Sequence, residues 1–237
     1  GDHRDLHSFP TRRSSDLLTG MEKHSDSREP DLMNNANAFI DTLREKSCAF
    51  TGQSYLIAMN QLSNHDHSRF LTRTNHKVGR VDELGSEAAE EGVSKAVFRE
   101  AVAMMMTWHG APTIYYGDEA GVCGFTDPDS RRTYPWGHED QDLIRYHKEL
   151  IRVRKENPAC RRGSGIPVYA KGGHFAFGRF LGDNHVLTII NNTEEAERMT
   201  IPVWQLEIPD GELFERQVLS MEEEFNLEKA HYLVCDG

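Results

Sequence analysis

Two segments of the sequence repeat one order, in which a short apolar run ends in polar side chains. Residues 55–59 are apolar and predict a buried strand, and the polar cluster of residues 60–70 follows at once. Residues 113–117 are β-branched and aromatic and predict a second buried strand, which ends in two acidic residues. A helical pattern that begins at Gly92 and stops at residues 110–112 lies between them. This order predicts an α/β fold with a parallel sheet, and such folds place their chemistry at the strand ends.

Two more helices are predicted around these strands. Residues 32–47 carry apolar side chains on one helical face, and we expect Asp31 to cap that helix. Residues 140–157 show the same kind of pattern, and we expect His147 to lie there at an interface or on the surface. The methionines of the central helix are expected to pack in the core rather than to bind a metal.

From about Gly163 the pattern changes to short strand-like runs that alternate with glycine turns. The turns are indicated at residues 172–173 and 182–184. This pattern predicts an antiparallel β-domain over residues 163–237. The expected strands cover residues 166–169, 174–180, 185–191, 198–203 and 232–235. The last of these is followed by a hairpin signal without a returning strand, which predicts an open sheet edge.

Charge and cysteine content exclude several classes of protein. Acidic residues number 38 against 27 basic ones, a formal charge of −11, which argues against nucleic-acid binding. No apolar run has the length of roughly 18 residues that a membrane span needs. The four cysteines are scattered without a Cys-x-x-Cys pair, which favours free thiols and a cytoplasmic location. They are Cys48, Cys123, Cys160 and Cys235.

Residues 1–17 show neither a helical nor a strand period. They also resemble the translation of a sequencing adapter, so we expect a non-native or disordered segment and leave it out of the fold. The expected division of the remainder is residues 18–162 and residues 163–237.

The polar cluster resembles a known motif. Asn64-His65-Asp66 followed by Ser68-Arg69-Phe70 is similar to the strand-seven motif of the α-amylase superfamily, glycoside hydrolase family 13, and most of all to its α-glucosidases and neopullulanases. The second strand matches the superfamily's strand-eight pattern, Gly-x-Pro-x-Ile-Tyr-Tyr-Gly-x-Glu-x-Gly, over residues 110–121. Residues 127–136 resemble the loop that follows strand eight. The resemblance implies the C-terminal part of a (β/α)8 TIM barrel, followed by an antiparallel β-sandwich domain.

The resemblance also implies roles for particular residues. Asp66 would stabilise the transition state of α-glucosidic bond hydrolysis, and His65 would bind the same sugar of a maltodextrin-like substrate. Asn64 would fix the turn or contact sugar. Arg69 is a further candidate for a sugar contact, and it would pair with a carboxylate or be an exposed cation. Residues expected at the rim of the pocket are Asp118, Glu119, Arg131 and Tyr134.

The catalytic pair of the superfamily is expected to be absent from this chain. Retaining hydrolysis needs a nucleophilic carboxylate and an acid/base carboxylate. In the superfamily these follow strands four and five, and the resemblance begins only at the helix before strand seven. We therefore expect this chain alone to be inactive. No cofactor is evident, and although some superfamily members bind calcium, no ligand set for it is readable.

Two alternatives to this interpretation remain open. His65, Asp66 and His67 could form the core of a metal site, because imidazole and carboxylate are common ligands. Alternatively, the chain could be a carbohydrate-binding or structural module without turnover.

Overall fold

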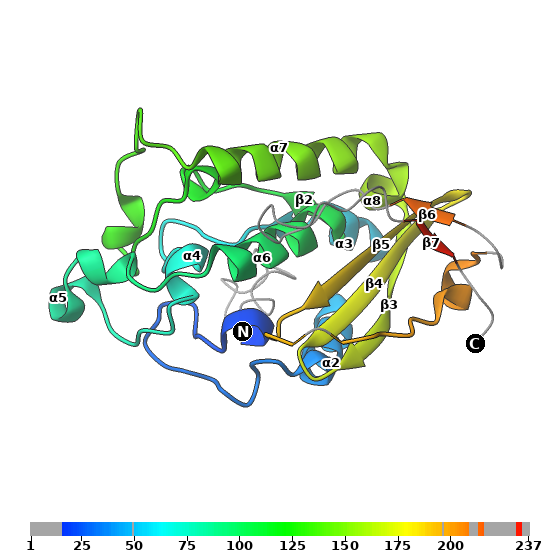
Figure 1. Cartoon of the computed structure of the whole chain (residues 1–237), viewed down its shortest axis with the longest axis horizontal. Coiled ribbons are helices and arrows are strands. Elements are labelled where there is room, and N and C mark those ends of the chain that lie inside the picture. The colour runs from blue at the N-terminus through cyan, green and yellow to red at the C-terminus, as the bar shows by residue number, and fades with distance from the viewer. Residues whose placement is uncertain (1–15, 49, 196, 209–212, 216–230, 234–237) are drawn as a thin grey trace.

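The computed structural model describes residues 16–48, 50–195, 197–208, 213–215 and 231–233 (Figure 1). The helices α6 (Lys95–Thr107) and α7 (Gln141–Glu156) lie side by side on one side of the molecule. The three-stranded sheet of β3 (Ser164–Lys171), β4 (His174–Leu181) and β5 (Asn184–Asn191) lies beside them, with α2 (Ala36–Ser47) packed against it. No helix among the described residues is long and apolar enough to cross a membrane.

The two predicted strands pair in parallel, as expected, but each is short. Strand β1 (Met59–Asn60) pairs with β2 (Ala111–Pro112), with Met59 opposite Ala111. The chain between them forms α4 (Phe70–Arg73), α5 (Val81–Leu84), the 3-10 turn η2 (Glu87–Ala89) and α6 (Lys95–Thr107). After β2 come two further 3-10 turns, η3 (Asp118–Ala120) and η4 (Asp129–Arg131). The parallel sheet is therefore confirmed, and its carboxyl edge faces the loops that carry the predicted site.

The extent of both predicted strands is wrong. Most of residues 55–59 belongs to the helix α3 (Gly52–Ile57), which Thr51 caps by accepting a hydrogen bond from the Ser54 amide. The side chain of Ile57 is 76% exposed, so the run is not a buried strand. A short apolar run cannot by itself distinguish a strand from a helix, and here a capped helix formed. Likewise, residues 113–117 lie beyond the end of β2.

The predicted helices form, with one change of cap. Helix α2 (Ala36–Ser47) starts later than expected, because the Asn35 side chain and not Asp31 accepts the hydrogen bond from the Ala38 amide. Asp140 caps α7 (Gln141–Glu156) by accepting from two amides of the first turn. His147 is buried at the interface with α6, where its ring lies 5.9 Å from that of Phe98. The short helix α8 (Pro158–Arg162) follows.

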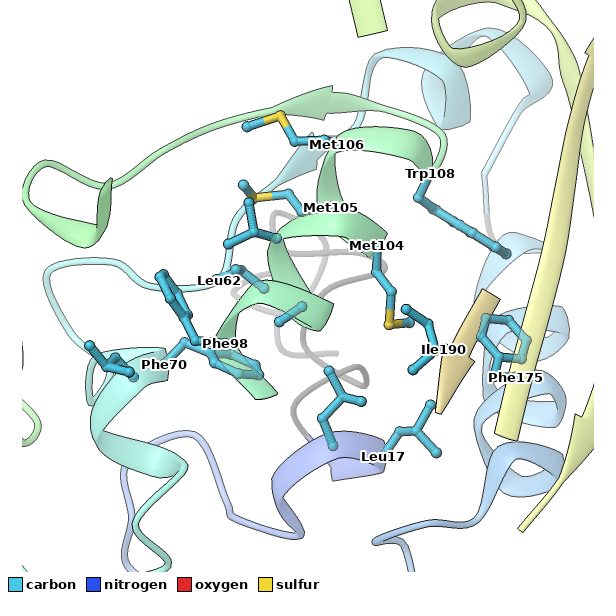
Figure 2. Close-up of a cluster of buried hydrophobic side chains, with 14 of the residues drawn as sticks. Leu17, Leu62, Phe70, Phe98, Met104, Met105, Met106, Trp108, Phe175 and Ile190 are labelled. Carbon is cyan, nitrogen blue, oxygen red and sulfur yellow. The ribbon is translucent and has the colours of Figure 1, made fainter. Parts of the chain in front are cut away.

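One hydrophobic core joins the helical part to the β-sheet (Figure 2). The methionines of α6 are buried in it, as the sequence predicts. Phe175 and Ile190 enter the same core from strands β4 and β5, so it crosses the expected division at residue 163. Leu17 is also buried in this core, although we left residues 1–17 out of the fold; residues 1–15 lie outside the described residues.

Three strands of the C-terminal part form an antiparallel meander. Strands β3 (Ser164–Lys171), β4 (His174–Leu181) and β5 (Asn184–Asn191) are adjacent in that order. The turns between them place Gly172 and Gly182 at positive φ, +57° and +55°, which glycine adopts without steric cost. Three predicted strands and both turns are therefore confirmed.

The rest of this part differs from the prediction. No strand forms over residues 198–203, where Pro202 lacks the amide hydrogen that a sheet needs; the 3-10 turn η5 (Val203–Leu206) follows. Strand β6 (Leu213–Glu215) pairs with β7 (His231–Leu233), so the predicted last strand has a partner through residue 233. Residues 234–237, which carry the hairpin signal, lie outside the described residues. The described strands do not establish a β-sandwich.

Glu100 on α6 gives the fold a predicted pH dependence. Burial raises the pKa of its carboxyl to about 8, and its Oε2 atom has no hydrogen-bond partner among the described residues. The folded state keeps a proton that the unfolded chain releases above its ordinary pKa, so stability falls as pH rises from about 5 to about 8. We expect Glu100→Gln to remove most of this fall, which is up to ~1.4 kcal/mol per pH unit. Urea unfolding at pH 5, 6.5 and 8 measures it.

The matched control for Glu100 is Glu149→Gln, because Glu149 lies exposed on α7. That variant should keep the pH dependence of the parent chain. Parallel stability profiles of the Glu100 variant and the parent chain would contradict the prediction.

Candidate active site

Asn64 shapes the turn that follows β1. Its Oδ1 atom accepts hydrogen bonds from the amides of Asp66 and His67, both at 2.9 Å. This Asx-turn is the local reason why the chain reverses directly after the strand. The structure thus assigns the Asn64 oxygen to the turn, the first of the two roles that the sequence suggested.

Asp66 and His65 present their side chains to solvent next to each other. The His65 Nε2 atom lies 3.4 Å from Asp66 Oδ1, and the two side chains are 61% and 60% exposed. Their backbone is fixed from the other loop: the His65 carbonyl accepts from Ser130 Oγ at 3.0 Å, and the Asp66 carbonyl accepts from Thr126 Oγ1. Hydrogen bonds therefore fix the backbone of both residues, while their side chains stay accessible to a ligand, as a substrate-binding position requires.

Arg69 lies beneath this pair and joins the two loops. Its side chain is fully buried, and Nη1 lies 2.9 Å from Asp118 Oδ1. It also donates from Nη1 to the Tyr116 carbonyl at 2.7 Å and from Nε to the Ser130 carbonyl at 2.8 Å. Of the two readings left open, pairing with a carboxylate is correct and an exposed cation is wrong. The expected sugar contact by Arg69 does not fit the structure, because burial keeps its guanidinium from reaching a ligand.

Two tyrosines and a serine complete the surroundings of the ion pair. The Arg69 guanidinium lies 4.0 Å from the centre of the Tyr115 ring and 4.9 Å from that of Tyr116. Burial raises the pKa of the Asp118 carboxyl, while Arg69 and a hydrogen bond to Ser63 oppose the shift. Asp118, which we also expected at the rim of the pocket, is instead buried, because its carboxylate pairs with Arg69. Nothing in the sequence indicates this pairing.

The predicted rim residues gather on the loop after β2. Arg131 places Nη2 3.9 Å from Asp66 Oδ1, while its Nε is 2.7 Å from Asp127 Oδ1. Glu119 accepts a hydrogen bond from the Gly117 amide at 3.0 Å. Loss of solvent and the nearby carboxylates of Glu119 and Glu139 raise the pKa of the Tyr134 phenol. The loop thus brings Arg131 to Asp66 and Glu119 near Tyr134.

His67 contacts another histidine, His24, and does not join a group of metal ligands with His65 and Asp66. Its ring lies 5.1 Å from the ring of His24, whose Nδ1 is 2.9 Å from Thr126 Oγ1. Across the part of the chain that the structure describes, no group of three or more His, Cys, Asp or Glu side chains is placed to hold a metal ion. The geometry therefore gives the metal hypothesis no support.

The family model for the alpha-amylase catalytic domain matches residues 18–136, the segment that contains both strands and the whole candidate site. The chain belongs to the alpha-amylase family. The resemblance drawn from the two strand motifs is therefore confirmed, and this is a family of glycoside hydrolases.

Curated relatives are much longer than the chain. It is 40% identical over 121 residues to an amylopullulanase of Thermoanaerobacter thermohydrosulfuricus, covering 51% of the chain and 8% of the relative. It is 36% identical over 148 residues to neopullulanase 2 of Thermoactinomyces vulgaris, covering 61% of the chain and 22% of the relative. The chain thus spans less than a quarter of either relative.

Solved structures agree on the fold. The debranching enzyme of Nostoc punctiforme superposes with a TM-score of 0.69 at 23% identity, over 94% of the chain and 46% of that structure. A cyclomaltodextrinase superposes with a TM-score of 0.61 at 25% identity, over 76% of the chain and 27% of that structure. Together with the family model, these likenesses support an α/β fold that contains a TIM barrel.

Proposed function

We propose that this chain forms part of an enzyme that hydrolyses α-glucosidic bonds in maltodextrin-like α-glucans with retention of configuration. The observation that carries the proposal is the placement of Asp66 and His65. Both side chains are exposed at the carboxyl edge of two parallel strands, on a main chain held by hydrogen bonds from the opposite loop. This edge is where TIM-barrel enzymes bind their substrates. The names of the relatives, neopullulanase and cyclomaltodextrinase, point to α-glucans.

In this proposal, Asp66 is the carboxylate that binds hydroxyl groups next to the reacting carbon. Hydrolysis passes through a state with positive charge on the sugar ring, and a fixed carboxylate lowers the energy of that state. His65, 3.4 Å away, binds the same sugar. Arg131 lies 3.9 Å from Asp66 and is itself paired with Asp127, so it orients the carboxylate without neutralising it fully.

The nucleophile and the proton donor belong, in this proposal, to other strands of the barrel. The chain on its own would then bind sugar without turnover, and no cofactor is required. A carbohydrate-binding or structural module is the second candidate, favoured by the fact that the chain covers only 22% of neopullulanase 2. Release of p-nitrophenol from an aryl α-glucoside distinguishes them: activity in the complete gene product and none in this chain supports the proposal.

Replacing Asp66 by asparagine in the complete gene product should lower kcat by about 10²–10³-fold, because the fixed charge is lost while the shape is kept. The measurement is the steady-state hydrolysis of p-nitrophenyl α-glucoside. Asp142→Asn, at an exposed position on α7, is the control and should leave kcat unchanged. An Asp66→Asn enzyme with the parent kcat would refute the assigned role.

A further inference from the structure

Two aromatic side chains stand together on the loop between β2 and α7. Trp136 is 80% exposed, and its ring centre lies 4.6 Å from that of Tyr134, with 50° between the ring planes. Single exposed apolar residues are common on protein surfaces and need no explanation. Two aromatic rings in contact, on the loop that also carries Arg131, form a continuous surface, which we call the Tyr134–Trp136 pair.

Both rings sit on a backbone that is held in place. The Trp136 amide donates to the Tyr134 carbonyl at 2.9 Å, and the His138 amide donates to the Pro135 carbonyl at 2.8 Å. Gly137 adopts a φ of +81°, which closes this turn. A ligand that stacks here would therefore lose little binding energy to ordering the loop.

Thr133 and Pro135, which flank Tyr134 in the chain, line a hollow of about 540 Å³. Figure 1 shows the loop projecting from the body of the molecule just before α7. With Trp136 80% exposed, the aromatic surface is open to a ligand.

We propose that the Tyr134–Trp136 pair is a stacking surface for a glucose ring of an α-glucan chain whose neighbouring units reach Asp66. One face of a pyranose ring carries C–H groups, which pack on the electron-rich face of an aromatic ring. The ring edge carries hydroxyls, and Glu119 beside Tyr134 offers an acceptor for them. The inference rests on the proposed function, because it takes the α-glucan as substrate.

The surroundings favour a sugar over an apolar protein partner. Charged groups border the aromatic pair, with Glu119 on one side and Arg131 earlier on the same loop. An apolar helix would bury these charges without partners, whereas a saccharide can hydrogen-bond to them. Trp136 lies five residues after Arg131, which contacts Asp66, so the chain path between them spans at most about 18 Å. An oligosaccharide of a few units covers that distance.

The three tryptophans of the chain make the test direct. Trp108 is buried, while Trp136 and Trp204 are both largely exposed, at 80% and 73%. Maltoheptaose titrated into the chain should change the tryptophan fluorescence, and Trp136→Phe should abolish that change. Retardation in native gels that contain amylopectin gives affinity independently of fluorescence. There, Trp136→Ala should weaken binding about tenfold, and the control Trp204→Ala by less than about twofold.

Equal retardation of the two alanine variants, with binding retained, would overturn the stacking surface and leave the proposed function standing. Failure of the parent chain to bind either glucan would also overturn it, because the surface would then have no ligand. The proposed function itself is tested separately, by the hydrolytic activity of the Asp66→Asn variant of the complete gene product. An active Asp66→Asn enzyme, together with Trp136-dependent binding, would refute the role of Asp66 and keep the stacking surface. Circular dichroism spectra that match the parent chain establish that the variants fold.

Discussion

Replacing Arg69 by methionine should destabilise the chain by about 3–5 kcal/mol, the usual cost of removing one partner of a buried ion pair. The variant leaves the Asp118 carboxylate buried without its 2.9 Å partner. It also removes the donors to the carbonyls of Tyr116 and Ser130. Because these bonds join the loop after β1 to the loop after β2, the loss falls on the region that holds Asp66. Urea unfolding followed by circular dichroism measures the change.

Two further variants test whether the destabilisation comes from breaking the buried ion pair rather than from removing any arginine. Arg80→Met removes an exposed arginine that pairs with Asp26 at 2.6 Å, and it should leave the urea midpoint almost unchanged. The double variant Arg69→Met with Asp118→Leu should recover much of the loss, because no charge is left buried alone. If Arg69→Met unfolds at the same urea concentration as the parent chain, the ion pair does not hold the two loops together.

Replacing Arg179 by alanine should cost on the order of 3–5 kcal/mol, because three carbonyls lose their donor, two of them in buried hydrogen bonds. Arg179, on β4, donates to the carbonyls of Thr107 at 2.9 Å, Gly163 at 2.8 Å and Ser164 at 3.2 Å. Burial lowers the pKa of its guanidinium to about 10, and the side chain still carries its charge at neutral pH. The expected result in a thermal melt is a Tm lower by about 10 °C.

The matched control for Arg179 is Arg152→Ala. Arg152 lies exposed on α7, and its ion-pair partners among the described residues are Glu149 and Glu156 of its own helix. Removing it should leave Tm within the error of the melt, since exposed ion pairs contribute little. Equal Tm values for the Arg179 variant and the parent chain would show that water replaces the lost donor, and that the bonds do not fasten the sheet to α6.

The sequence predicted the elements with strong periodicity and missed those decided by single hydrogen bonds. Helices α6 and α7 follow their apolar spacing, and the three strands β3–β5 follow their alternation and glycine turns. The helix α3 was mistaken for a strand, because its short apolar run fits either period. The cap of α2 was placed at Asp31, although Asn35 makes the bond. Both residue types are good caps, and sequence alone does not rank two candidates four residues apart.

The division at residue 163, the sugar contacts of His65 and Asp66, and the cytoplasmic location stay predictions. The buried thiols of Cys123 and Cys160 are free, and burial raises the pKa of the Cys123 thiol to about 11, so this thiol is poorly reactive.

By itself, the sequence determined the family and the order of the site residues. The spacing of Asn64-His65-Asp66 and the strand-eight pattern is local along the chain, and each motif can be read without knowing its neighbours in space. Only the tertiary structure decided what each polar residue does. Arg69 and Arg131 are both cations near Asp66 in the expected site, yet one is buried against Asp118 and the other lies exposed beside Asp66. The difference depends on contacts between segments 49 and 65 residues apart, and no local pattern records such contacts.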